Sequence, residues 1–240
     1  MTFNQQEFDI RCEWGEQGVA HLAPISDVCI IVDILSFSTS VDIAVSRGAI
    51  VFPYSWRDQR AAEYATKLGA ELADSRRSKS KYSLSPESLT HITKGTKIVL
   101  PSPNGSTLTL TAKPATIIAG SLRNARSAAL AAQKYGQKIA VIAAGERWQT
   151  DHSLRPSFED LIGAGAIINY LKGSLSPESL AAKTIFQALE SKLEAILKQC
   201  SSGKELIEKG FENDVILASQ LNSSDSVPIL IDDVYIGNQN

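Results

Sequence analysis

The segment that most constrains the fold is a continuous apolar run, Val28–Leu35, interrupted only by Asp33. A run of this kind is typical of a parallel strand that is covered by helices on both faces. Four hydroxyl side chains follow within residues 36–40, and the segment 41–47 then ends in an Arg-Gly helix stop signal. The sequence therefore predicts a strand, a polar turn and a helix in direct succession.

The same alternation of strand and helix recurs along the chain. Further strands are predicted at 50–54, 97–100, 116–119, 138–144 and 229–235, and further helices at 58–68, 124–135 and 158–172. This alternation predicts an α/β fold, with a mainly parallel or mixed sheet and helices on both faces in an α/β/α layered arrangement. We expect a single domain over residues 1–240, with two closely packed lobes, about 1–115 and 116–240, as the alternative.

Two other features concern helices and loops. Residues 177–209 carry charges at helical spacing and are predicted as one or two surface helices. A heptapeptide at 83–89 recurs unchanged at 174–180, and its Ser-Pro-Glu core predicts two similar helix starts. The basic, serine-rich stretch 74–83 is predicted as a mobile loop.

Charge and cysteine content exclude several classes of protein. The chain has 24 Lys and Arg against 26 Asp and Glu, a net charge of -2, which provides no overall attraction to nucleic acid or to an anionic membrane. Its three cysteines, Cys12, Cys29 and Cys200, are odd in number and lack zinc-site spacing. No apolar run is long enough to cross a bilayer. We therefore expect a cytoplasmic protein without a nucleic-acid or membrane partner, and a homodimer is considered as its oligomeric state.

Polar residues that follow the predicted strands are the candidates for a binding site, because ligands of open α/β sheets bind at the carboxyl ends of the strands. Asp33 comes first, since a carboxylate in an apolar strand is costly to bury unless a cation or hydrogen-bond donors meet it. Ser38 and Thr39 follow, and hydroxyls at a helix start are suited to binding an oxyanion. Ordinary capping of the turn is the alternative, and both interpretations stay open.

Two more polar segments follow predicted strands. The turn of Asn104, Gly105 and Ser106 combines an amide, a permissive glycine and a hydroxyl. Arg147 stands where its guanidinium is placed to bind a phosphate group in bidentate fashion. The alternatives are a plain turn for the first segment and, for Arg147, a salt bridge to Glu146 or to another neighbour.

Two acidic pairs lie further along the chain. Glu159 and Asp160 open the predicted helix at 158–172, where the helix dipole favours acids in any case. Carboxylates from separate loops are also what a hard divalent cation requires, so both interpretations stay open. Asp232 and Asp233 are predicted to lie within a late strand and are weaker candidates.

Several known catalytic motifs are absent from the sequence. There is no phosphate-binding P-loop, no dinucleotide-binding glycine motif and no nucleophile elbow. The position two residues after Asp33 is Leu35, so the second acid of phosphatases that attack through an aspartate is missing. The three histidines, His21, His91 and His152, lack the spacing of metal ligands.

Taken together, five segments in one order carry a family resemblance. They are Val32-Asp33-Ile-Leu-Ser-Phe-Ser-Thr-Ser40, Asn104-Gly105-Ser106, Ser121-Leu-Arg-Asn124-Ala, Ala144-Gly145-Glu146-Arg147 and Glu159-Asp160-Leu-Ile-Gly-Ala-Gly165. With these segments the chain resembles the 2-phosphosulfolactate phosphatase family over residues 30–168, and more weakly over 214–230. Each motif alone is unspecific, whereas five in order are fairly specific.

The resemblance implies a magnesium-dependent phosphatase of α/β architecture that releases phosphate from 2-phosphosulfolactate, giving sulfolactate on the route to coenzyme M. Its substrate would be a small anionic phosphorylated molecule. By position it implies that Asp33, Glu159 and Arg147 are catalytic and that Mg²⁺ is held by Asp33, Glu159 and Asp160. The phosphate-binding residues that it implies are Ser38, Thr39, Asn104, Gly105, Ser106 and Asn124.

The chain also departs from the family pattern. Ser36 stands where the family usually carries an arginine, and Asp74-Ser75-Arg76 stands where it has Gly-Glu-Arg. Arg76, Arg77 and Arg155 are candidates to compensate, with surface charge as the alternative. A non-catalytic sensor of a phosphorylated or sulfonated metabolite is therefore the rival hypothesis. Whether Asp33 would act as ligand, base or nucleophile is left open.

Overall fold

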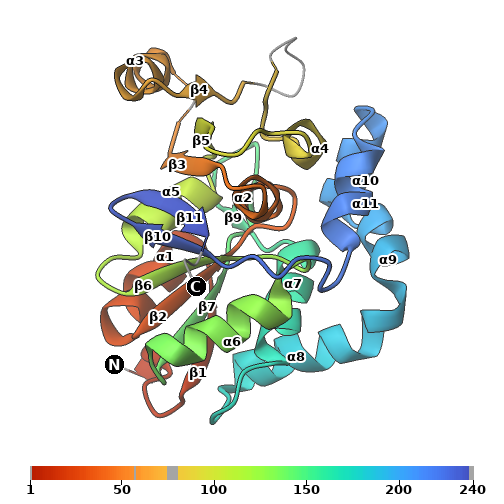
Figure 1. Cartoon of the computed structure of the whole chain (residues 1–240). Coiled ribbons are helices and arrows are strands. Elements are labelled where there is room, and N and C mark those ends of the chain that lie inside the picture. Colours follow the sequence, from red (N-terminus) through yellow and green to blue (C-terminus); the bar gives the residue numbers. More distant parts are fainter. Residues whose placement is uncertain (1, 57, 75–80, 238–240) are drawn as a thin grey trace.

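The computed structural model describes residues 2–56, 58–74 and 81–237 (Figure 1). Within these residues nine strands form one mixed sheet. In spatial order the strands are β1 (Ile10–Trp14), β7 (Ile139–Ala143), β2 (Val28–Val32), β6 (Thr116–Gly120), β10 (Pro228–Ile231), β11 (Val234–Gly237), β3 (Ile50–Tyr54), β5 (Lys97–Pro101) and β4 (Glu71–Leu72). A separate hairpin pairs β8 (Glu146–Arg147) with β9 (Leu154–Arg155).

The sheet consists of two parallel groups joined by a hairpin. Strands β1, β7, β2 and β6 are parallel to one another, as are β3, β5 and β4. The hairpin β10–β11 pairs in antiparallel fashion with β6 on one side and β3 on the other, so the two groups run in opposite directions along the sheet. The division near residue 115 considered for two lobes does not coincide with these groups, because β2 lies between β6 and β7.

The two groups meet at their carboxyl ends. The carboxylate of Asp33, directly after β2, accepts the N–H of Gly105, which follows β5, at 3.0 Å. The segments that follow β2 and β5 are therefore in contact although the strands belong to oppositely directed groups. The twist that is general in β-sheets, roughly 20–25° between neighbouring strands, allows the ends of such groups to approach each other.

Helices cover both faces of the sheet. On one face lie α6 (Ala125–Tyr135), α7 (Phe158–Ile168) and α8 (Pro177–Leu189), and on the other lie α1 (Gly15–Leu22), α2 (Phe37–Ser46) and α5 (Gly105–Thr111). Strand β2 contributes Ile30 to the first apolar layer and Ile31 to the second, and both side chains are fully buried. This two-sided burial explains why β2 is an uninterrupted apolar run, and it confirms the α/β/α layering.

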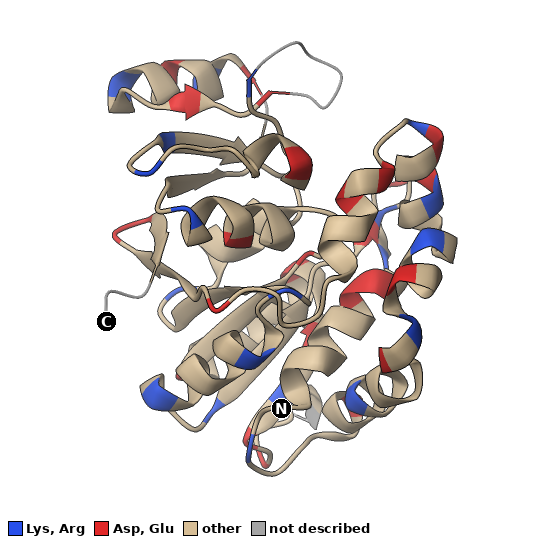
Figure 2. Cartoon of the chain, turned by 45° about the vertical axis from the view of Figure 1, so that its right-hand side comes forward, with Lys and Arg blue, Asp and Glu red and all other residues tan. Residues whose placement is uncertain are grey.

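The remaining helices lie at the periphery. They are α3 (Gln59–Leu68), α4 (Pro86–Leu89), α9 (Leu193–Gln199), α10 (Ser201–Glu208) and α11 (Glu212–Ser219). The segment 177–209 therefore holds three α-helices rather than one or two. Figure 2 shows charges of both signs on their outer surfaces, as expected of solvated helices. Of the loop predicted at 74–83, residues 75–80 lie outside the described residues.

The helix after β2 begins earlier than predicted. It starts at Phe37 rather than at residue 41, because the turn that precedes it is closed by Asp33 and Ser38. The Ser38 hydroxyl donates to the Asp33 carbonyl oxygen at 2.8 Å and accepts from the Asp33 N–H at 3.1 Å. The hydroxyl cluster that was assigned to a turn therefore forms the first turn of α2.

The predicted late strand at 229–235 is instead the hairpin of β10 and β11. Asp232 and Asp233 form its two-residue turn, with φ of 48° and 67°. A turn of this type needs positive φ at both central residues, and aspartate tolerates that conformation better than most residues. The prediction that this acidic pair lies inside a strand is wrong for that reason. Among the described helices, none has the length and apolar character needed to span a membrane.

Candidate active site

Asp33 lies where the carboxyl ends of β2 and β5 meet. Its Oδ1 accepts the Phe37 N–H at 3.2 Å, and its Oδ2 accepts the Gly105 N–H at 3.0 Å. One bond closes the turn into α2, and the other reaches the start of α5 in the opposite strand group. Only 7% of the residue is exposed, so this buried carboxylate connects the two parallel groups.

Asp160, in the first turn of α7, connects two further loops. Its Oδ1 accepts the Ile34 N–H and its Oδ2 accepts the Gly145 N–H, both at 2.8 Å. It therefore ties the loop after β2 to the loop after β7. Burial raises the pKa of Asp160 well above its ordinary value, and the charges of Asp33 and Glu159 raise it further. Two hydrogen bonds from backbone amides act in the opposite direction.

Glu159, which is buried, and Glu146, which is half-buried, complete the group of acids. Glu159 is 2% exposed and interacts with the thiol of Cys200, which stands at the start of α10. Glu146 accepts a hydrogen bond from the Asn104 amide at 3.0 Å. Burial, followed by the charge of Asp33, raises the pKa of Glu146 to about 7, and Glu159 adds to this effect. We refer to Asp33, Glu146, Glu159 and Asp160 as the acidic cluster.

Three of the predicted phosphate-binding residues donate their hydroxyl hydrogen bonds to backbone carbonyl oxygens. Ser38 donates to the Asp33 carbonyl oxygen, Thr39 to that of Ile34 at 2.8 Å, and Ser106 to that of Leu100 at 3.0 Å. All three hydroxyl residues are fully buried. In this arrangement they shape the turns that carry Asp33 and Gly105. Their contact with phosphate stays a prediction.

Asn124 also stabilises a turn through hydrogen bonds. Its Oδ1 accepts from the N–H and hydroxyl of Ser121 at 2.8 and 3.0 Å, and its Nδ2 donates to the carbonyls of Ala119 and Ser226 at 3.2 and 3.1 Å. These bonds shape the turn between β6 and α6. Within the described part of the chain, none of them reaches the acidic cluster, so its assignment as a phosphate ligand stays a prediction.

Arg147 lies beside the acidic cluster in sequence but is directed elsewhere. Its guanidinium pairs with the Glu16 carboxylate at the start of α1 and also donates to the His152 carbonyl at 3.3 Å. The salt bridge considered for it from the sequence therefore exists, but with Glu16 rather than Glu146. Arg155 donates to the Ser202 hydroxyl at 3.1 Å. Arg76 and Arg77 lie outside the described residues.

A cavity of about 260 Å³ adjoins the acidic cluster. It lies between the start of α1, the turn before α5 and the β8–β9 hairpin. Its polar lining comes from Glu16, Gln17, Asn104, Glu146, Arg147, His152 and Ser153. Asn104 and Glu146 thus belong to the cavity, and Glu146 belongs to the acidic cluster as well.

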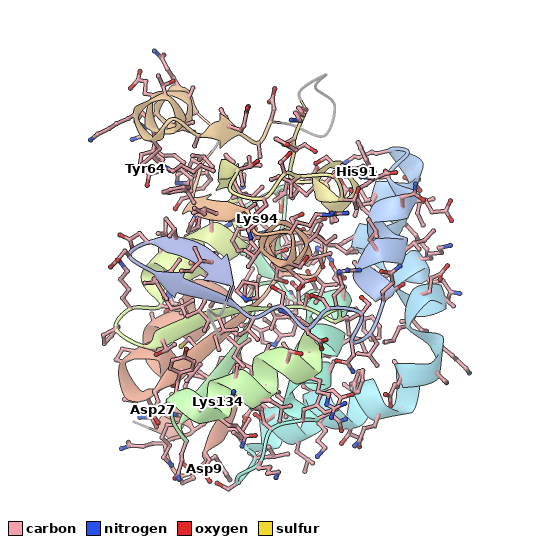
Figure 3. The ribbon with its side chains drawn as sticks, in the orientation of Figure 1. Asp9, Asp27, Tyr64, His91, Lys94 and Lys134 are labelled. Carbon is pink, nitrogen blue, oxygen red and sulfur yellow. The ribbon has the colours of Figure 1, made fainter. Side chains whose placement is uncertain are left out.

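Two further acids lie far from this site, at the other end of the strands. Asp9 and Asp27 precede β1 and β2, and Figure 3 shows them at the lower edge of the molecule together with Lys134. Asp9 pairs with Lys138 at 3.0 Å, and Asp27 accepts the N–H of Gln137 at 2.9 Å. These acids lie at the amino ends of the strands, where they stabilise loops.

The chemistry of the acidic cluster suits a divalent cation, although the ligand set is not assembled. Carboxylate oxygens are the ligands that Mg²⁺ prefers, and a cation would offset the mutual repulsion that raises the pKa of Asp160 and Glu146. Among the described residues, no three Asp, Glu, His or Cys side chains surround one point as metal ligands. Asp33 and Asp160 direct their carboxylate oxygens at backbone amides.

Comparison with known proteins identifies the family of the chain. A family model described as 2-phosphosulpholactate phosphatase matches residues 17–233. The chain belongs to this family. The match extends beyond residues 30–168, over which the resemblance is visible in the sequence alone, and it confirms that resemblance.

Individual relatives are of moderate similarity. A protein of Thermotoga maritima, "Probable 2-phosphosulfolactate phosphatase", is 34% identical over 143 residues, 59% of this chain and 60% of the relative. One of the same name from Carboxydothermus hydrogenoformans is 35% identical over 140 residues, 56% of each chain. The 2-phosphosulfolactate phosphatase of Methanothermobacter thermautotrophicus is 26% identical over 209 residues, 86% of this chain and 88% of the relative. The chain thus spans less than two thirds of the length of the first two.

Glu146 is the site residue that sequence reasoning missed as a functional candidate. It belongs to the Gly145-Glu146-Arg147 motif, in which Arg147 is the functional candidate because its positive charge suits phosphate. An acid at the end of a buried strand is the signal that identified Asp33, and a similar signal is present at Glu146, three residues after the end of β7.

Proposed function

We propose that the protein is a magnesium-dependent phosphatase acting on a small phosphorylated hydroxy acid, with 2-phosphosulfolactate as the substrate that its family membership indicates. The observation that carries this proposal is the acidic cluster itself. Its carboxylates come from the loops after β2 and β7 and from the start of α7, and one of them, Glu146, lines a small cavity. Desolvated carboxylates gathered in this way need a counter-charge.

We assign the cation to Glu159 and Asp33, with Asp160 as a positioning residue. Glu159 is buried in the first turn of α7, and Asp33 lies at the end of β2, where its charge and that of Glu159 both act on Asp160. Asp160 uses both oxygens to hold the Ile34 and Gly145 amides, which sets the shape of two loops. When bound, Mg²⁺ would neutralise charge on the phosphoryl group and on these acids.

The protein's own groups would position the ester. The amino end of α2, which begins at Phe37, presents the positive end of the helix dipole next to Asp33. Asn104 orients the Glu146 carboxylate by a hydrogen bond and faces the cavity. Products of the proposed reaction are inorganic phosphate and sulfolactate, a hydroxy acid that carries a carboxylate and a sulfonate.

The test is release of phosphate from 2-phosphosulfolactate with and without MgCl₂, by the wild-type chain and by Glu159→Gln. We expect release that depends on Mg²⁺, and a fall in kcat of at least about 100-fold in the variant, because a carboxylate that holds the metal is lost. Glu208→Gln, on the exposed face of α10, is the matched control and should keep wild-type activity.

Two outcomes would contradict the proposal. Absence of metal-dependent phosphate release from this ester and from related phosphorylated hydroxy acids would reject the enzyme. Thermal stabilisation by those esters without any release would instead support the sensor hypothesis. Glu159→Gln is a sharper probe than Asp33→Asn, since an asparagine at position 33 would lose one of the two backbone hydrogen bonds and weaken the fold as well.

A further inference from the structure

We infer that the cavity beside the acidic cluster binds the second acidic group of the substrate, and that Arg147 is the residue that selects for it. This inference rests on the proposed function and extends it from the phosphate ester to the rest of the molecule. The chemistry recognised is a compact oxyanion, a carboxylate or a sulfonate, a few bonds away from the phosphoryl group.

The first support is the continuity of the cavity with the acidic cluster. Asn104 and Glu146 both line the cavity, Asn104 donates a hydrogen bond of 3.0 Å to Glu146, and Glu146 belongs to the acidic cluster. The charge of Asp33 acts on Glu146, which places the two carboxylates within electrostatic range. A phosphoryl group held by the acidic cluster would therefore direct the remainder of its ester into this cavity.

The second support is the position of Arg147. Its guanidinium lines the cavity and pairs with Glu16, in an ion pair whose side chains are 37% and 51% exposed. An exposed pair of this kind is only weakly stabilising, because water screens both charges. An oxyanion in the cavity that accepts two parallel N–H bonds from the guanidinium can therefore take the place of Glu16.

The shape of the cavity supports the same class of ligand. Its volume of about 260 Å³ lies below the usual range of pockets for larger ligands, so it suits an acid of a few carbon atoms. Pro103, Leu108 and Leu154 supply apolar lining for a short carbon chain. The start of α1 also lines it, and its positive dipole end favours an anion there.

The test compares three phosphate esters of secondary alcohols: isopropyl phosphate, 2-phospholactate and 2-phosphosulfolactate. Isopropyl phosphate carries no further acid, 2-phospholactate carries a carboxylate, and 2-phosphosulfolactate carries a carboxylate and a sulfonate. Arg147→Met should raise the KM for the acidic esters by about tenfold or more with kcat changed only a few-fold, and it should leave the KM for isopropyl phosphate unchanged. Glu16→Gln should lower the KM for the acidic esters, because Arg147 is released.

The pattern over the esters identifies the group that is bound. An effect already present with 2-phospholactate assigns the subsite to the carboxylate, and an effect confined to 2-phosphosulfolactate assigns it to the sulfonate. Equal changes for all three esters, or no change in Arg147→Met, would overturn the inference. Arg126→Met, an exposed arginine on α6, is the matched control, and thermal denaturation verifies that each variant is folded.

A binding measurement separates this inference from the proposed function. Sulfolactate, which carries no phosphoryl group, is titrated into the wild-type chain, Arg147→Met and Glu16→Gln by calorimetry. If no ester is hydrolysed but sulfolactate binds in an Arg147-dependent way, the proposed function fails and the subsite stands. If the wild-type chain does not bind sulfolactate, or Arg147→Met binds it equally well, the subsite is rejected whatever the esters show.

Discussion

At the scale of single residues, two buried aspartates organise the site through the backbone. Asp33 holds the amides of Phe37 and Gly105, and Asp160 holds those of Ile34 and Gly145. Ionised carboxylates form stronger hydrogen bonds to backbone N–H groups than neutral acceptors do. Three segments, those that follow β2, β5 and β7, are thereby held together before any metal or substrate binds.

Gly105 is a residue of the site whose replacement should be poorly tolerated. A Cβ at this position would lie 2.2 Å from Cδ1 and 2.8 Å from Cβ of Phe37, and the second of these atoms cannot swing away. Gly105→Ala should lower the free energy of unfolding by about 1–3 kcal/mol or more and displace the amide that Asp33 accepts. Urea denaturation and phosphate release measure the two effects. If this variant kept wild-type stability and activity, the packing of Phe37 against position 105 would not be tight.

Glu146 should make stability depend on pH. Its pKa is raised from 4.5 to about 7, so the folded chain holds this proton over a pH range in which the unfolded chain has lost it. Stability therefore falls as the pH rises through this interval and levels off above it. Glu146→Gln keeps an oxygen for Asn104 but carries no charge, and should be more stable than the wild type by about 1–3 kcal/mol at about pH 8.

Thermal denaturation of both proteins between about pH 5 and about pH 8 checks this effect without added metal. The two curves should converge at the acid end, where both side chains are neutral. If the stability of the variant and that of the wild type changed equally with pH over the whole interval, the raised pKa of Glu146 would be contradicted.

At the scale of secondary structure, one heptapeptide serves two different helices. At 83–89 it starts the single turn α4, where the Ser85 hydroxyl donates to Asp214 of α11 at 2.5 Å. At 174–180 it starts the thirteen-residue α8, where the Ser176 hydroxyl accepts the Ser179 N–H at 3.1 Å. The predicted helix starts are confirmed in both places, but only the second serine caps its own helix.

This difference predicts unequal costs for the same substitution. Ser176→Ala removes an N-cap, which is worth about 1 kcal/mol. Ser85→Ala removes a donor from a buried carboxylate, which costs about 1–3 kcal/mol and loosens α11 from α4. Urea denaturation of the two variants measures the difference. A greater loss for Ser176→Ala would show that Asp214 is satisfied by its other contacts.

At the scale of the whole molecule, the acidic cluster forms where two oppositely directed strand groups converge. Strand β5 lies five positions from β2 in the sheet, and the Gly105 amide that follows it is 72 residues from Asp33 in sequence. The hairpin β10–β11 joins the groups through one residue pair on each side, Ile229 with Ile118 and Tyr235 with Val51. The geometry of the site therefore depends on how the two strand groups pack against each other.

Binding of Mg²⁺ should stabilise the whole fold in a pH-dependent way. A ligand that binds only the native state raises its stability by mass action. Because the pKa of Glu146 is raised to about 7, the cluster has fewer negative charges at about pH 5 than at about pH 8. Excess MgCl₂ should therefore raise the melting temperature more at the higher pH.

Glu159→Gln should reduce this stabilisation at the higher pH, and Glu208→Gln should retain it in full. Differential scanning calorimetry with MgCl₂ and with an equal ionic strength of NaCl separates specific binding from screening. The same shift with both salts, or one that is insensitive to pH, would contradict a magnesium site at these acids.

The sequence by itself determined the central strands and the family. Strands β2, β3, β5, β6 and β7 lie within three residues of their predicted limits, because strands covered on both faces carry a local apolar pattern. Five short motifs in one order identify the family for a similar reason: each is a contiguous piece of chain. The acid at the end of β2 was recognised because an ionisable group in an apolar run is itself a local signal.

Only the tertiary structure decided what those residues touch. The bond from the Ile34 amide to Asp160 spans 126 residues, and the pairing of Arg147 with Glu16 spans 131. Neither has a local signature, because each depends on the twist of the sheet and on which loops it brings together. The start of α2, the turn at Asp232 and the inclusion of Glu146 in the acidic cluster follow from contacts of the same kind. Local pattern specifies an element, whereas a site is specified by distances between elements.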